Sequence, residues 1–145
     1  MLVIQVLIRF FFVENNEFLA KNGWKRLLRN VYKKRIINSY KKSWSHQSSS
    51  KWSKDNPARG QCGVTTLVVN DFLEGEIFKT WLDEGWHFYN VINGERMDFT
   101  KEQFSYLIDY QDIDSNRAEA FQDTNDDQYS YLKSQVNRIL SKAES

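Results

Sequence analysis

The chain has 145 residues and a formal net charge of +1, and 41% of its residues are hydrophobic and 15% aromatic. This length and composition predict a single domain with a sizeable core and exclude an intrinsically disordered chain. The near-neutral charge argues against a protein that works mainly by binding nucleic acid.

Residues 1–13 are apolar but are interrupted by Gln5 and Arg9. They are too few to span a bilayer and lack a signal-peptide cleavage pattern, so we do not expect a membrane protein. Three interpretations stay open, the weakest of which is a membrane anchor. This segment adds a strand or helix to the core, or residues 1–20 are an N-terminal extension, peripheral or the product of a misassigned start, beside a domain over residues 21–145.

Apolar residues recur every four positions between Trp24 and Trp44, and lysine and arginine fill the opposite face. This spacing predicts an amphipathic helix over residues 24–44. Its basic face has an alternative interpretation as an RNA or membrane surface, although a charged outer face is ordinary for a helix packed on a core. Residues 45–59 are rich in serine and end in Asp55-Asn56-Pro57, which predicts a loop.

Residues 62–72 fit two structures. Their β-branched residues favour a strand, whereas an apolar surface on every side is typical of a buried helix. Periodicity alone does not decide between the two. If the segment is a helix, Cys62 lies in its first turn, where free N–H groups and the helix dipole lower the pKa of a thiol.

Alternating residues predict strands over 75–82 and 86–92, and Asn93-Gly94 predicts a tight hairpin turn into a returning strand over 95–99. Thr100 and Gln103 match a capping box, which predicts a short helix to about residue 108. An acidic connection over 109–123 follows, and Thr124 is placed to cap a last helix. This order of elements predicts an α+β domain.

The hairpin register brings a histidine and a carboxylate together. It places Tyr89 opposite Asp98, and His87 shares the face of Tyr89, so His87 and Asp98 lie diagonally, at about 7 Å between backbones. An imidazole held by a carboxylate is the orienting half of a nucleophilic triad, for which Cys62 is the candidate nucleophile. Candidate oxyanion or site-lining residues are Asn56, Gln61 and Trp52, the last of which has an alternative place at the edge of the core.

Cys62 is the single cysteine, and the only histidines are His46 and His87. One cysteine excludes an intramolecular disulfide and is typical of a reducing compartment, so we expect a cytoplasmic protein. Cysteine and histidine are too few for a structural zinc site, and we expect neither a metal nor a cofactor. We expect His46, in the serine-rich loop, to be exposed to solvent.

The motifs Gly60-Gln61-Cys62, His87 to Asn90 and Asp98 to Thr100 resemble the transglutaminase-like branch of the papain-like cysteine hydrolase superfamily. Gly63 departs from that branch, which has an aromatic residue there, and Phe99 stands where proline is frequent. Over about residues 28–140 the chain more closely resembles the small bacterial YunG-like family, through Asn-Pro-Ala-x-Gly-Gln-Cys-x-Val-Thr, Gly-Glu-Ile, His-Phe-Tyr-Asn and Asp-Phe-Thr.

The resemblance implies a papain-like or transglutaminase-like core, in which a central helix starting at the nucleophilic Cys62 packs on a short antiparallel sheet. It also implies a cysteine hydrolase or acyltransferase, in which Cys62, His87 and Asp98 act on an amide of a small molecule, peptide or protein. The main alternative is a catalytically inactive domain of this fold that binds a peptide or protein partner. A nucleic-acid-binding module is a weaker alternative, and the sequence does not fix the oligomeric state.

Overall fold

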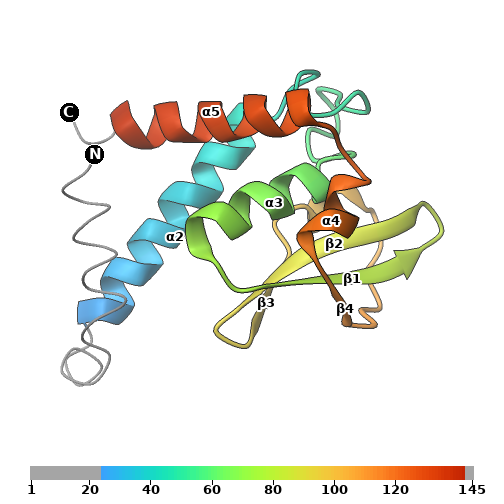
Figure 1. Cartoon of the computed structure of the whole chain (residues 1–145), viewed down its shortest axis with the longest axis horizontal. Helices are drawn as coiled ribbons and strands as arrows, with labels where there is room; N and C mark the ends of the chain where they lie inside the picture. The colour runs from blue at the N-terminus through green and yellow to red at the C-terminus, as the bar shows by residue number, and fades with distance from the viewer. Residues whose placement is uncertain (1–23, 143–145) are drawn as a thin grey trace.

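The structure is a computed structural model that describes residues 24–142. It is an α+β fold in which helices pack on one small antiparallel sheet (Figure 1). The helices are α2 (Trp24–Ser43), α3 (Cys62–Leu73), α4 (Arg117–Phe121) and α5 (Asp126–Lys142), and the strands are β1 (Glu76–Leu82), β2 (Gly85–Ile92), β3 (Glu95–Met97) and β4 (Ile113–Ser115). The predicted extension over residues 1–20 lies outside the described part of the chain.

Helix α3 lies at the centre of the fold, between the helices α2 and α5 and the sheet (Figure 1). On one side Val64, Val68 and Val69 join a core with residues of α2 and α5. On the other side Cys62 and Leu67 join a second core with residues of β1, β2 and α4. Burial on two sides explains the all-round apolar sequence, and it confirms the helical interpretation over the strand that local propensity favours.

The sheet has the strand order β3-β2-β1-β4. The predicted hairpin register is confirmed from Ile92 opposite Glu95 to Asn90 opposite Met97. At the turn, Asn93 has a φ of 53° and Gly94 a φ of 75°, the left-handed conformations that a tight hairpin turn requires. The ladder ends at Met97, so the expected strand pairing of Tyr89 with Asp98 does not form.

Two predictions near the predicted capping box are wrong. The helix expected to run to about residue 108 is only a 3-10 turn, Lys101–Gln103. The capping box does not form, because the Gln103 amide is used elsewhere. Its nitrogen donates to the carbonyl oxygen of Thr100 and its oxygen accepts from the backbone N–H of Gly60. The N–H of Thr100 donates instead to Asp98 Oδ1.

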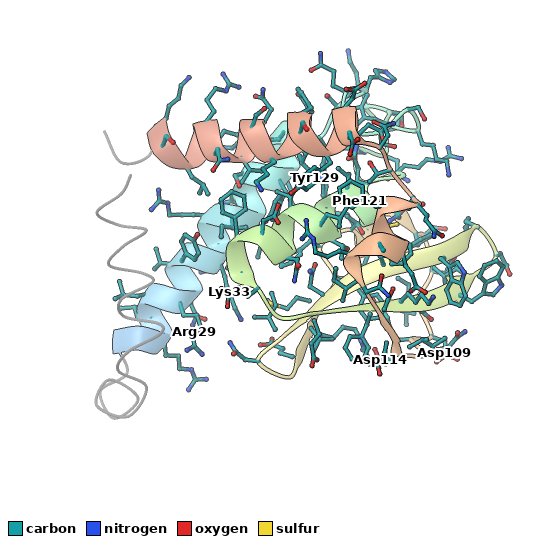
Figure 2. All side chains as sticks on the ribbon, viewed as in Figure 1. Arg29, Lys33, Asp109, Asp114, Phe121 and Tyr129 are labelled. Carbon is teal, nitrogen blue, oxygen red and sulfur yellow. The ribbon has the colours of Figure 1, made fainter. Side chains whose placement is uncertain are left out.

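The predicted acidic connection is also wrong in part, since residues 109–123 contain β4 and α4. Helix α5 begins at Asp126, and Asn125 caps it by accepting from the backbone N–H of Gln128, in place of Thr124. The rings of Phe121 in α4 and Tyr129 in α5 meet at 5.1 Å between centroids (Figure 2), which fixes the turn between these helices against α3. Within residues 24–142, no helix combines the length and hydropathy needed to cross a bilayer.

Candidate functional site

Cys62 is the first residue of α3, and its side chain is 6% exposed. The preceding turn contains the positive φ of Gly60, 71°, where any Cβ would lie 2.4 Å from Ser49 Oγ. Only glycine fits this position, and it lets the loop close tightly onto the start of the helix. The sequence therefore fixes the sulfur at a helix N-terminus.

His87, on β2, and Asp98, directly after β3, form the predicted pair. The distance between His87 Nε2 and Asp98 Oδ2 is 2.6 Å, and the two side chains are 2% and 3% exposed. A carboxylate at this distance accepts the Nε2–H and so selects the tautomer in which Nδ1 carries a lone pair. His87 Nδ1 is itself buried and has no hydrogen-bond partner within residues 24–142.

Asp98 is held from three further directions. Its carboxylate accepts from the Tyr110 hydroxyl at 2.8 Å, and from the backbone N–H and the hydroxyl of Thr100 at 3.0 and 3.3 Å. Burial alone would raise the pKa of Asp98, but the hydrogen bond and charge of His87, with the Tyr110 and Thr100 bonds, more than offset it and leave the pKa lowered. Asp98 is therefore a fixed anion against which the His87 ring is oriented.

Asp123, in the turn between α4 and α5, contacts Cys62 directly. The thiol of Cys62 donates to Asp123 Oδ2 at 3.3 Å, and the backbone N–H of Gly63 donates to the same oxygen at 3.1 Å. A Cβ on Gly63 would lie 2.7 Å from that oxygen and 2.9 Å from the carbonyl oxygen of Ala120. The missing side chain at Gly63, where the transglutaminase-like pattern has an aromatic residue, is what lets this turn approach α3.

The pKa of the Cys62 thiol is raised. Burial is the largest cause, the negative charge of Asp123 adds to it, and a backbone hydrogen bond from Phe88 opposes it only in part. This is opposite to the lowering expected from the helix N-terminus alone. The pKa of Asp123 is also raised, by burial of its carboxylate, against the hydrogen bonds from Cys62 and Gly63 and the charges of Lys51 and His87. The resting sulfur is therefore a protonated thiol.

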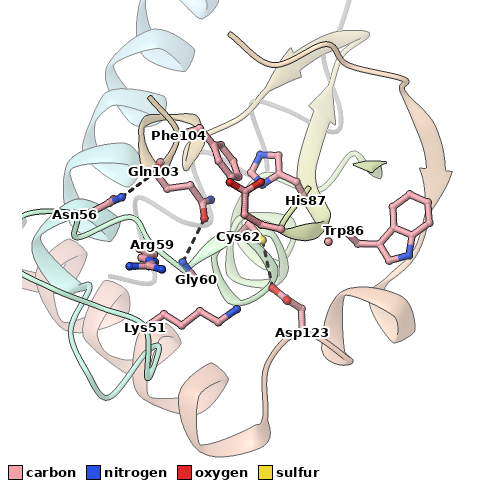
Figure 3. Close-up of a pocket in the computed structure, with 12 residues that line it drawn as sticks. Lys51, Asn56, Arg59, Gly60, Cys62, Trp86, His87, Gln103, Phe104 and Asp123 are labelled. Atoms are coloured by element: carbon pink, nitrogen blue, oxygen red, sulfur yellow. Dashed lines mark hydrogen bonds between the residues drawn. The ribbon is translucent and has the colours of Figure 1, made fainter. Parts of the chain in front are cut away.

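Cys62, His87 and Asp123 line one cavity of about 280 Å³. Figure 3 shows His87 and Asp123 on opposite sides of Cys62 in this view, with Lys51 and Arg59 at the other end of the cavity. Phe104 covers the His87 ring edge-on, at 5.0 Å between centroids. The cavity therefore leads to the sulfur of Cys62, whereas most of the His87 imidazole is shielded from solvent.

The three predicted oxyanion or site-lining residues differ in their placement. Asn56 lines the cavity, but its Nδ2 donates to the carbonyl oxygen of Gln103 at 2.8 Å (Figure 3). Gln61 is fully buried as the residue before α3, with no partner for its amide within residues 24–142. Trp52 packs at the edge of the core beside α2, and neither it nor Gln61 is among the cavity-lining residues.

Asn90, which matches the motif, donates from its side chain to the carbonyl oxygen of Thr66 and so ties β2 to α3. His46 is exposed, as expected, and its ring meets that of Trp52 at 4.8 Å. Asp123 is the site residue that sequence reasoning missed. It is 61 residues from Cys62, and the one signal for its approach was a glycine inside an apolar helix. The described residues contain no group of three cysteine, histidine or carboxylate side chains arranged to hold a metal.

The family model described as YunG protein matches residues 32–141, which is most of the chain. The chain belongs to the YunG family. A relative from Bacillus subtilis (strain 168), described as Uncharacterized protein YunG, is 57% identical over 85 residues, which cover 59% of this chain and 74% of the relative. No solved structure matches the chain. The range matched by the YunG model includes Cys62, His87, Asp98 and Asp123.

Proposed function

We propose that this chain is a cysteine hydrolase or acyltransferase with a papain-like or transglutaminase-like core, acting on an amide bond of a small molecule, peptide or protein. One observation carries the proposal. His87 is held by Asp98 through Nε2, its buried Nδ1 has no hydrogen-bond partner within residues 24–142, and the residue lines the same cavity as Cys62. A buried polar atom without a hydrogen-bond partner lowers the stability of the fold, and such atoms are typical of functional sites.

In the proposed reaction, His87 Nδ1 accepts the thiol proton, and the sulfur of Cys62 attacks the amide carbon. The imidazolium, stabilised by the Asp98 carboxylate, then protonates the amide nitrogen, and the amine leaves as the thioester forms. The backbone N–H of Cys62, at the start of α3, is placed to stabilise the oxyanion. Attack on the thioester by water releases an acid, and attack by an amine forms a new amide. Either step returns the proton to Cys62.

The contact with Asp123 sets a condition on this mechanism. The thiol donates to a carboxylate in the resting protein, and this bond must break before the proton passes to His87. It also occupies the N–H of Gly63, the other donor at the start of α3. Substrate entry therefore has to displace or neutralise Asp123 before the nucleophile forms.

The same contact favours a second candidate function, a catalytically inactive domain that binds a peptide or protein partner. A buried thiol with a raised pKa, beside a carboxylate, reacts slowly. The two candidates differ in what His87 does. In an enzyme it activates Cys62, whereas in a binding domain its exchange leaves the reactivity of the sulfur unchanged.

Alkylation of Cys62 by iodoacetamide tests the proposal cleanly, because the chain has no other cysteine. His87→Gln keeps an N–H donor for Asp98 but removes the base, and His46→Gln is the matched control in an exposed loop. We expect His87→Gln to slow labelling at pH 7 by at least about ten-fold, which is less than the roughly 100-fold or more that a general base contributes to a catalysed step. His46→Gln should label at the wild-type rate. Equal rates for His87→Gln and wild type would favour the binding domain.

A further inference from the structure

A second hollow, of about 470 Å³, lies beside the Cys62 cavity, between α4 and the tip of the β1–β2 hairpin. The two share four lining residues, among them Asp123, Glu84 and Trp86. Asp123 touches the reacting sulfur, so a group bound in the second hollow lies next to the site of attack. The catalytic steps proposed above leave this hollow unused.

One wall of the hollow is aromatic and open. Trp81 and Trp86 face each other across β1 and β2, with ring centroids 5.0 Å apart, and they remain 53% and 41% exposed. The Lys79 ammonium lies 4.4 Å from the Trp86 ring centroid, on its face. The ring thus already accepts a cation, the contact that aromatic faces make with ammonium and guanidinium groups.

The hollow is acidic. Its charged lining residues are three carboxylates and one lysine, and Lys79 is paired with Glu119 at 2.8 Å. Among the described residues, the Glu84 carboxylate accepts only from the Tyr106 hydroxyl, and the Asp123 carboxylate only from the Cys62 thiol and the Gly63 N–H. Neither Glu84 nor Asp123 has an ion-pair partner within residues 24–142. Beside the aromatic wall, Glu84 and Asp123 therefore lack a direct ion pair among the described residues, and the charge of Lys51 acts on Asp123 only at longer range.

We propose that this hollow is a subsite for a cationic side chain of the substrate, an arginine or lysine. Its aliphatic stem lies against Trp81 and Trp86, and its charged head pairs with Glu84 and Asp123. The assignment rests on the proposed function, because it places that side chain beside the sulfur that attacks. Aromatic walls bury the stem, and carboxylates at the far end select the charge.

Binding of a cation in this subsite would also displace or neutralise Asp123, as the proposed mechanism requires. A guanidinium or ammonium that pairs with Asp123 offsets the negative charge beside Cys62 and competes for the oxygen that holds the thiol proton. In Figure 3 the Lys51 side chain extends toward Asp123, and its charge acts on that carboxylate although the two form no ion pair. A cationic substrate therefore releases the thiol from Asp123 more readily than a neutral substrate does.

Binding of two matched ligands tests the subsite without turnover. Nα-acetyl-arginine amide and Nα-acetyl-citrulline amide differ in the charge of the terminal group. They are titrated into full-length Cys62→Ala, and the indole N–H signals of the five tryptophans report where they bind. We expect the arginine compound to bind at least about ten-fold more tightly and to shift the signals of Trp81 and Trp86.

Asp123→Asn and Glu84→Gln should each reduce that preference, by at least about three-fold, since each removes one charge-assisted contact. Asp114→Asn is the matched control, because Asp114 is exposed on β4 at the lower edge of the sheet in Figure 2. Equal binding of the two compounds, a preference that survives both variants, or no shift at about 10 mM arginine compound would overturn the subsite. These outcomes do not involve His87, so the labelling test above can fail independently.

Discussion

Gly63→Ala tests the close approach of the Asp123 turn to α3. The new Cβ would lie 2.7 Å from Asp123 Oδ2, 2.8 Å from Asp123 Cβ and 2.9 Å from the carbonyl oxygen of Ala120. The last of these is backbone, so the clash is not relieved by rotating a side chain. The turn must move back, and the bonds from the Cys62 thiol and the Gly63 N–H to Asp123 must lengthen or break.

Two opposing effects set the size of the change. Alanine is better than glycine inside a helix by about 1 kcal/mol, and less than this in the first turn. Forcing an extra methyl into a closed contact costs about 1–3 kcal/mol, and two lost hydrogen bonds add about 1 kcal/mol each. We therefore expect Gly63→Ala to lower the free energy of unfolding by about 2–5 kcal/mol.

Urea unfolding measures that loss, and iodoacetamide labelling of the native variant measures the release of the thiol. We expect labelling at pH 7 to become faster than in wild type, because Asp123 no longer holds the proton. Asp123→Asn is the control that removes the charge without the clash, and it should speed labelling with little loss of stability. A Gly63→Ala chain that is as stable as wild type or more stable, and that labels at the wild-type rate, would refute the close approach.

Three further changes separate structure from chemistry. Asp98→Asn should lower the free energy of unfolding at pH 7 by about 2–4 kcal/mol, since it weakens charge-assisted hydrogen bonds to a buried group. The pKa of Asp98 is lowered in the folded state, so the stability that its carboxylate contributes is fully present above the unfolded pKa of about 3.9 and is lost as pH falls through the folded pKa. The difference in urea stability between wild type and Asp98→Asn should therefore shrink from pH 7 to pH 3. Tyr110→Phe removes one donor to Asp98 and should cost about 1 kcal/mol in the same assay, with a smaller pH dependence than wild type. Trp44→Phe leaves the buried Thr65 hydroxyl without its 3.0 Å donor and should cost about 1–3 kcal/mol, while Cys62 labels at the wild-type rate. A changed rate would show that the site is coupled to the packing between α2 and α3.

The turn residues of the β2–β3 hairpin made the His87–Asp98 pair predictable from the sequence. Asn93-Gly94 fixes a two-residue turn, the turn fixes the register, and the register brings His87 within reach of Asp98. The hydrogen bond between His87 and Asp98 forms even though the strand pairing ends at Met97, because the two side chains span a longer distance than backbone hydrogen bonds do. Local sequence was sufficient here because the interacting residues are 11 positions apart.

Tertiary contacts decided the rest. Residues 62–73 carry a β-branched sequence, yet they form α3 because both sides of the helix are buried. Strand β4 and helix α4 have three and five residues, too short for a periodic pattern to appear in an acidic segment. Asp123 belongs to that segment, and its contact with Cys62 depends on how α4 packs against α3. No local pattern carries that information.

Acylation of Cys62 is the most direct test of the proposed chemistry. The full-length protein is mixed with p-nitrophenyl acetate, and release of p-nitrophenol is followed together with the intact mass. We expect one acetyl group to appear on Cys62 in the native protein and in His46→Gln, to form at least about 100-fold more slowly in His87→Gln, and to be absent from Cys62→Ala. The same rate in His87→Gln as in wild type would contradict the assignment of His87 as the base, and acetylation elsewhere with Cys62 unmodified would contradict the assignment of Cys62 as the nucleophile.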